Sequence, residues 1–207
     1  MPSSETRLET WNRKLHSYVG LYLLVFVWLF AVSGLIINHP KWPMQNWWPA
    51  RKQERFEKPL RPVGGTTRLE RARDVLAQLG IAGEIGWNGP AAPPGRLVFR
   101  AGRPGTSYEI DADLAGGVAR VAKTTVNGWG ALHIMHTFSG VHAGEPEDTR
   151  DWAMTRVWSF SMDAVAVGLA FMVLSSWWIW FRAGRKRLWG ALALAAGLAL
   201  CVALLRM

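Results

Sequence analysis

Residues 18–37 read YVGLYLLVFVWLFAVSGLII, and none of these side chains is charged. A helix of about 20 residues is roughly 30 Å long, which matches the hydrocarbon core of a bilayer. The run is too long for the apolar core of a signal peptide, and NHPKWP follows it where a cleavage site would need small residues. We therefore expect a retained first transmembrane helix that stops at Pro40.

Two further apolar runs occupy residues 157–181 and 188–205. Between them, residues 182–187 read RAGRKR, and the N-terminal segment is also basic. Because positively charged loops stay on the cytoplasmic side of a membrane, we expect the N-terminus and this loop to be cytoplasmic. Residues 38–156 and the C-terminus would then face the periplasm. The expected fold class is a mainly α membrane protein with three transmembrane helices.

The composition agrees with a membrane protein. The net charge is +9 and there are 13 tryptophans. The basic residues flank the apolar runs and the tryptophans lie at their ends, which is typical of membrane interfaces, so we expect a lipid bilayer and not nucleic acid as the partner. The single cysteine, Cys201, excludes an intrachain disulfide and a cysteine-rich metal site.

Residues 66–123 resemble a small soluble α+β module in composition. Thr67 and Glu70 have the spacing of a capping box, which predicts a helix that ends at Gly80. Strands are predicted where β-type residues lie between Gly and Pro turns, at residues 85–87, 96–100, 106–111 and 118–123. The preceding residues 40–65, rich in Pro, Trp and charge, are expected to form an extended linker. A module of about 60 residues is marginally stable alone, so we expect it to dock onto the membrane part.

The segment before the second apolar run is rich in histidine. Residues 130–140 read GALHIMHTFSG and contain His133 and His136, and His142 follows two residues later. Histidine is the side chain that most often binds transition metals and haem iron. The alternative is that these are ordinary interface histidines, bonded to backbone groups or water.

Four short motifs in chain order resemble the PepSY-associated transmembrane helix family. They are RKLH at residues 13–16, SGLIINH at 33–39, the histidine segment, and SSWWIW at 175–180 followed by basic residues. The resemblance implies a protein of the bacterial inner membrane linked to iron uptake. Some larger relatives are haem-containing reductases of ferric siderophores, although this chain has fewer spans than they do.

The resemblance also implies how the chain is organised. A small α+β PepSY-like extracytoplasmic domain would be inserted between the first and second of the three transmembrane helices. The expected parts are the cytoplasmic N-terminus with the first helix, the linker with the PepSY-like periplasmic domain, a histidine-containing interfacial segment, and the second and third helices. Their expected boundaries are residues 1–39, 40–127, 128–156 and 157–207.

Spacing limits which histidines can hold a haem b together. His16 and His39 are about 23 residues apart on one helix, roughly 34 Å, so they cannot share a haem. His133 and His136 have i, i+3 spacing and share a helix face, so they cannot bind opposite sides of one iron. A bis-histidine haem therefore needs one of this pair together with His39, the available partner at the outer face. We place His142, expected to face solvent, and His16, which lacks a histidine partner at the inner face, after these three.

One acidic residue lies inside the second apolar run. Asp163 is about two turns into that run, where an ionised carboxylate is costly unless it is paired. Its i, i+7 spacing from Arg156 places both on the same side of a helix. These two residues would support a ligand histidine or a haem propionate, or Asp163 would carry a proton. The alternative is a structural hydrogen bond from Asp163 to Ser33, Ser159 or Ser161.

Two functions from different classes follow. The first is a haem-binding inner-membrane redox protein that passes electrons to ferric iron or a ferric siderophore at the periplasmic face, as a ferric reductase does. The second is a non-catalytic PepSY membrane module that binds a partner protein or assists an uptake system. The sequence contains no glycine-rich flavin or nicotinamide fingerprint. Electrons would then come from another membrane redox partner, and a homo-oligomer would be needed to complete a site at His16.

Overall fold

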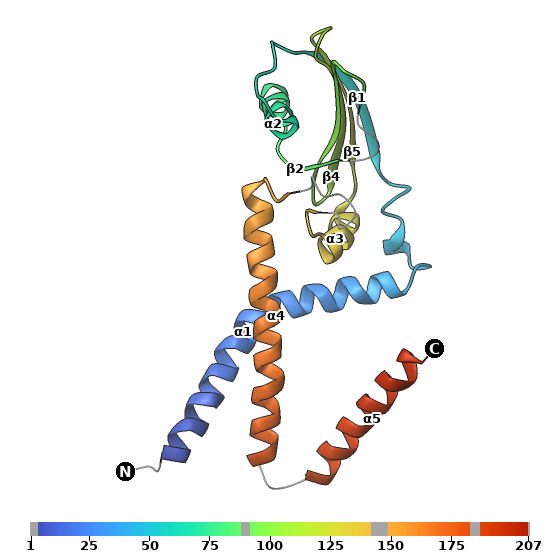
Figure 1. Cartoon of the computed structure of the whole chain (residues 1–207). Helices are drawn as coiled ribbons and strands as arrows, with labels where there is room; N and C mark the ends of the chain where they lie inside the picture. Colours follow the sequence, from blue (N-terminus) through green and yellow to red (C-terminus); the bar gives the residue numbers. More distant parts are fainter. Residues whose placement is uncertain (1–3, 88–91, 142–148, 183–186, 207) are drawn as a thin grey trace. The chain divides into compact units, whose positions relative to one another are not determined.

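The computed structural model describes residues 4–87, 92–141, 149–182 and 187–206, with side chains from residue 7 onward. The chain forms two compact units, one of residues 28–162 and one of residues 1–27 with 163–207. Among the described residues, three helices are long and apolar enough to cross a membrane (Figure 1). They are α1 (Ser4–Asn38), α4 (Ala153–Arg182) and α5 (Arg187–Leu205).

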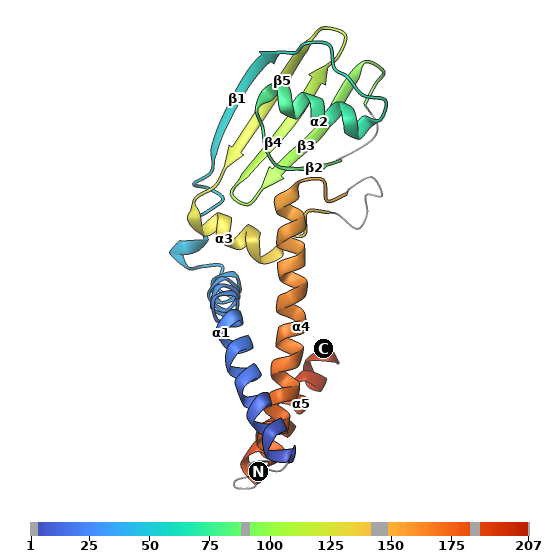
Figure 2. The same cartoon turned by 90° about the vertical axis from the view of Figure 1, so that its left-hand side faces the viewer.

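A five-stranded antiparallel sheet lies in the chain between α1 and α4. Its strands are β1 (Lys52–Pro59), β2 (Glu84–Gly86), β3 (Arg96–Arg103), β4 (Thr106–Asp113) and β5 (Val118–Thr125). Their order across the sheet is β1-β5-β4-β3-β2, with tight hairpins joining β3 to β4 and β4 to β5. The helix α2 (Arg68–Leu79) covers one face (Figure 2). The α+β module predicted for residues 66–123 is therefore present.

The core of this sheet domain lies between α2 and the sheet. Burial alternates along β3, where Leu97, Phe99 and Ala101 are buried and their neighbours Arg96 and Arg100 are exposed. A strand with this period presents one apolar face, and the apolar face of α2 packs on it. The helix contributes the buried side chains of Ala72, Val75, Leu76 and Leu79, and the other strands add Ile85, Tyr108, Ile110, Ala112, Ala119 and Val121.

The ends of α2 follow the predicted local signals. The backbone N–H of Glu70 donates to the Thr67 hydroxyl, and the Glu70 carboxylate accepts from the Thr67 backbone N–H, so the capping box is complete. Hydrogen bonds from the backbone N–H groups of Thr66 and Thr67 lower the pKa of Glu70. Gly80 ends the helix with φ of 70°, a left-handed conformation that costs glycine little.

The extended linker predicted over residues 40–65 is wrong for residues 52–59, which form β1. This strand pairs with β5 along its whole length and makes the sheet five-stranded. Its sequence, KQERFEKP, lacks the apolar alternation of a half-buried strand because it lies at the edge, where only Phe56 packs against the core. Opposite charges join it to its neighbour instead, through Arg120–Glu57 at 2.9 Å and Lys123–Glu54 at 3.0 Å.

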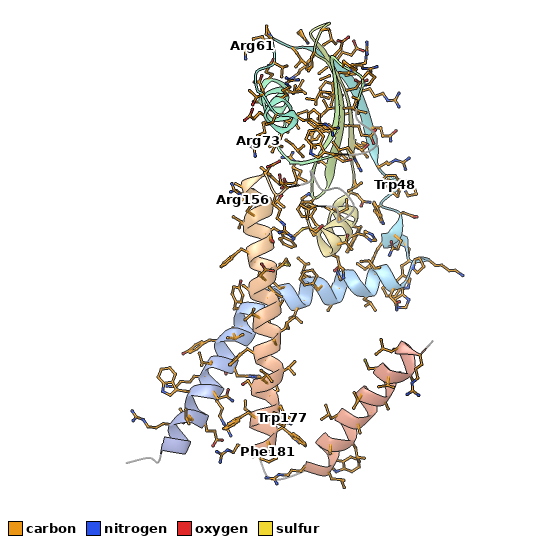
Figure 3. All side chains as sticks on the ribbon, in the orientation of Figure 1. Trp48, Arg61, Arg73, Arg156, Trp177 and Phe181 are labelled. Atoms are coloured by element: carbon orange, nitrogen blue, oxygen red, sulfur yellow. The ribbon has the colours of Figure 1, made fainter. Side chains whose placement is uncertain are left out.

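Within the unit of residues 1–27 and 163–207, α1 and α4 approach one another closely at Gly168. A Cβ atom placed on Gly168 of α4 would lie 3.1 Å from the side chain of Leu23, which is buried. Small residues at such contacts let helix backbones approach closely. At the C-terminal end of α4, Trp177 and Phe181 project from the helix (Figure 3), with ring centroids 6.3 Å apart. The adjacent Arg182 lies over Trp178, and this mixture of aromatic and basic side chains is typical of a membrane interface.

Candidate functional site

The histidine segment forms a helix, α3 (Gly128–Thr137), as the i, i+3 argument assumed. It begins where the Asn127 side chain accepts a hydrogen bond from the Gly130 backbone N–H at 2.9 Å. The hairpin between β3 and β4 holds it against the sheet domain, since Val126 N–H donates to the Gly105 carbonyl at 3.0 Å. A Cβ atom on Gly105 would lie 3.3 Å from Ala131 of α3. The helix is thus a fixed part of the unit of residues 28–162.

His136 is anchored by a serine of α1. Its Nδ1 atom lies 2.7 Å from the hydroxyl of Ser33, a residue that is almost fully buried. That hydroxyl also donates to the Leu29 carbonyl at 2.8 Å. With the hydroxyl proton on this carbonyl, the Ser33 oxygen accepts from the His136 tautomer that carries its proton on Nδ1, and the lone pair of that tautomer is on Nε2. The ring of Phe30 meets the imidazole edge-on at 5.3 Å and limits its rotation.

His133 packs against Trp47 of the segment that follows α1. Their ring centroids are 4.8 Å apart. The His133 Nδ1 atom is buried and has no hydrogen-bond partner among the described residues. Trp47 can approach α3 because residue 130 is glycine, where a Cβ atom would lie 3.0 Å from the Trp47 Cβ. A buried imidazole nitrogen without a partner is costly in a protein interior, so it marks a place where a ligand would be stabilising.

His39 lies just beyond the end of α1 and is half-buried. It stacks on Trp42 with ring centroids 4.4 Å apart and planes 13° from parallel. The described contacts therefore bring His39, His133 and His136 into one compact unit, each against an aromatic ring, without placing two of the imidazoles against one another. Within the described ranges, no group of three or more His, Cys, Asp or Glu residues could hold a metal ion.

The other two histidines, His142 and His16, were expected to be less important candidates. His142 lies outside the described residues. His16 Nδ1 is 3.2 Å from the hydroxyl of Ser175 on α4, and that hydroxyl donates to the Asn12 side-chain oxygen at 3.0 Å. His16 is thus bonded to a buried serine, although the sequence supplied no histidine partner for it.

Asp163 and Arg156 have exposed side chains, and neither side chain makes a hydrogen bond or ion pair within the described part of the chain. The Ser161 hydroxyl donates to the Val157 carbonyl and the Ser33 hydroxyl to the Leu29 carbonyl. Those two hydroxyl protons are therefore not available to the Asp163 carboxylate. The hydrogen-bond partner of His136 is Ser33, which sequence reasoning considered as a partner of Asp163. The signal that could have identified it is its position as the lone serine in the run of residues 18–37.

A buried carboxylate ties the start of α4 to the sheet domain, and the sequence did not single it out. Glu84 of β2 is 5% exposed and accepts hydrogen bonds from the backbone N–H groups of Asp151 and Trp152. Burial raises the pKa of Glu84, against the opposing effect of these hydrogen bonds. Arg73 of α2 adds an ion pair to the Asp151 side chain at 2.7 Å (Figure 3).

Comparison with known proteins identified no similar protein. No family model, curated protein or solved structure matches the chain. The function of the histidine site is therefore argued from its own geometry.

Proposed function

We propose that this chain is a haem b-binding redox protein of the bacterial inner membrane and a member of the PepSY-associated transmembrane helix family. In this proposal its N-terminus is cytoplasmic and the sheet domain periplasmic, and it passes electrons to ferric iron or a ferric siderophore at the periplasmic face. The observation that carries the proposal is the hydrogen bond between His136 Nδ1 and the Ser33 hydroxyl. Ligand histidines characteristically donate their second ring nitrogen to a fixed acceptor, which orients the ring and the tautomer.

The residues present fit a haem better than a bare metal ion. The donors are imidazoles surrounded by Phe30, Trp42 and Trp47, and aromatic apolar walls suit a porphyrin ring. A bare cation site would instead need three or more clustered polar ligands, and the described residues contain no such cluster. The buried and unpartnered nitrogen of His133 is consistent with a site that receives a further group.

Each residue then has a stated role. His136 would supply one axial nitrogen through Nε2, and Ser33 would hold the proton on Nδ1. His39 remains the proposed second axial ligand, and Trp47 would fix His133 beside the site. Haem b, when bound, supplies a one-electron ferric/ferrous couple. Since iron(II) binds siderophores far less tightly than iron(III), one-electron reduction would release the metal.

The visible spectrum of the full chain, purified from cells with ample haem, tests the proposal. We expect a Soret band and sharp reduced α and β bands that are lost in His136→Ala, and loss of the six-coordinate low-spin spectrum in His39→Ala. His16→Ala should leave the spectrum intact. A colourless and folded preparation would reject the redox function, and bleaching by His16→Ala but not by His39→Ala would place the site at the inner face.

Ser33→Ala tests the positioning role separately. It should weaken haem retention about 10-fold, as is typical when a hydrogen-bond partner of a ligand is removed. The matched control is Ser17→Ala, because Ser17 also donates to the carbonyl four residues earlier, at 3.0 Å. Equal effects of the two variants would show that α1 needs its serines for helix structure and not for His136.

One observation favours the second candidate, a non-catalytic module that binds a partner protein. The sheet face opposite α2 forms a shallow depression of about 750 Å³ that includes Arg55, Val98, Glu109 and Arg120. Among the described elements, α2 packs on the sheet face that carries the core, and the depression lies on the other face (Figure 2). A folded preparation without haem that retains a partner through this face would favour this function.

A further inference from the structure

A groove lies between the end of the β3–β4 hairpin, α3 and the tryptophans that follow α1. Its volume is about 400 Å³, within the range of small-molecule sites. All of its lining residues belong to the unit of residues 28–162. The residues that matter for recognition are Trp47, Trp48, Arg100 and Arg103, with backbone around Gly105 and the side chain of Thr106.

The charge of the groove is positive where its side chains are exposed. Arg103 sits at the hairpin turn with an exposed side chain, and it makes no ion pair within the described part of the chain. Arg100 also lines the groove. The one acidic lining residue, Glu84, is occupied, because its carboxylate accepts the backbone N–H groups of Asp151 and Trp152. The guanidinium of Arg103, which has no carboxylate partner among the described residues, is well suited to an anionic ligand.

The apolar wall of the groove is aromatic. Trp48 is 51% exposed, so part of its ring is accessible from the groove. The guanidinium of Arg51 lies 4.2 Å from the centre of its ring, and Trp47 meets it edge-on at 5.5 Å. These contacts hold the indole in place, and a held indole presents a flat surface to a flat ring at little entropic cost.

We infer that this groove binds a small organic anion that carries a flat ring. The ring would pack against Trp48 while Arg103 pairs with the negative group. The inference uses none of the histidines, so it stands without haem. Only its link to electron transfer rests on the proposed function. That link is Trp47, which lines the groove and also packs on His133 at 4.8 Å.

Three probes separate the ring from the charge. Calorimetric titration of the full chain in nanodiscs of uncharged lipid, with empty nanodiscs subtracted, would use 2-naphthalenesulfonate, 2-naphthalenemethanol and cyclohexanesulfonate. The first carries both features and should bind, whereas the neutral ring and the non-aromatic anion should each bind at least about 10-fold more weakly. Equal affinity for 2-naphthalenesulfonate and 2-naphthalenemethanol would overturn the inference. So would the absence of 2-naphthalenesulfonate binding below about 10 mM.

Variants locate the binding in the groove. Arg103→Gln and Trp48→Leu should each weaken binding of 2-naphthalenesulfonate about 10-fold, and Arg103→Lys should retain most of it. The matched controls are Arg61→Gln, at the opposite end of the sheet domain from Trp48 (Figure 3), and Trp129→Leu, an exposed tryptophan of α3 outside the groove lining. Controls that lose affinity as much as the groove variants would refute the site. If Trp48→Leu fails to fold, the three arginine variants decide the question.

Discussion

Replacing Glu84 by alanine tests whether one buried carboxylate joins the sheet domain to the start of α4. Glu84 is 5% exposed, and its two oxygens accept the Trp152 N–H, each at 3.3 Å, in addition to the Asp151 N–H. Thr155, the third residue of α4, is fully buried. Glu84→Ala leaves the Trp152 N–H without an acceptor, whereas the Asp151 N–H keeps the Thr149 carbonyl at 3.0 Å.

The magnitude follows mainly from the Trp152 N–H. A buried donor without an acceptor costs about 1–3 kcal/mol, and loss of a helix N-terminal acceptor typically costs about 1 kcal/mol. We expect about 2 kcal/mol for the loss of the acceptor of the Trp152 N–H, within this range. This free energy corresponds to a roughly 30-fold increase in the population of the locally opened start of α4.

Hydrogen exchange measures that opening directly. In the full chain, peptides that cover residues 150–156 should exchange about 30-fold faster in Glu84→Ala than in the wild type. Peptides of β4 should exchange at the wild-type rate. The control is Glu109→Ala, an exposed glutamate on the open face of the sheet. The reasoning is refuted if residues 150–156 exchange at the wild-type rate in Glu84→Ala, or if Glu109→Ala accelerates them equally.

Two further predictions concern pH and topology. Burial raises the pKa of Glu84 above its ordinary 4.5, so the folded state binds the Glu84 proton more tightly than the unfolded state does. Protonation of Glu84 therefore contributes to the free energy of unfolding. This contribution is complete below pH 4.5 and is lost as the pH rises through the raised pKa. Glu84→Gln keeps an acceptor but cannot titrate, so the free energy of unfolding, measured from pH 4 to 8, should lose this dependence; an unchanged profile would exclude Glu84 as its source. For topology, in a Cys201→Ser background, Glu109→Cys should react with an impermeant thiol reagent from the periplasmic side and Gly184→Cys only from the cytoplasmic side. Labelling of position 109 from the cytoplasmic side alone would reverse the orientation.

Local patterns in the sequence determined the parts of this protein that depend on neighbouring residues. The uncharged run of residues 18–37 is sufficient for a long apolar helix, and α1 ends at Asn38, close to the predicted stop at Pro40. Thr67, Glu70 and Gly80 specify both ends of α2 because a capping box and a left-handed glycine act within one turn of the chain. The strands from β2 to β5 were predicted from another local signal, β-type residues between Gly and Pro turns. Their ends differ from the predicted ends by at most a few residues.

Contacts between distant residues were decided only by the tertiary structure. The strand β1 carries charges on both sides and is stabilised by its pairing with β5, so no apolar period could indicate it. Ser33 and His136 are 103 positions apart, and Glu84 and Asp151 are 67 apart. A serine in an apolar run and a glutamate beside a short strand look ordinary in sequence, because burial and a hydrogen-bond partner are properties of the folded chain. The histidines could be read as candidate ligands from their spacing, whereas the tautomer of His136 depends on which hydroxyl lies beside it.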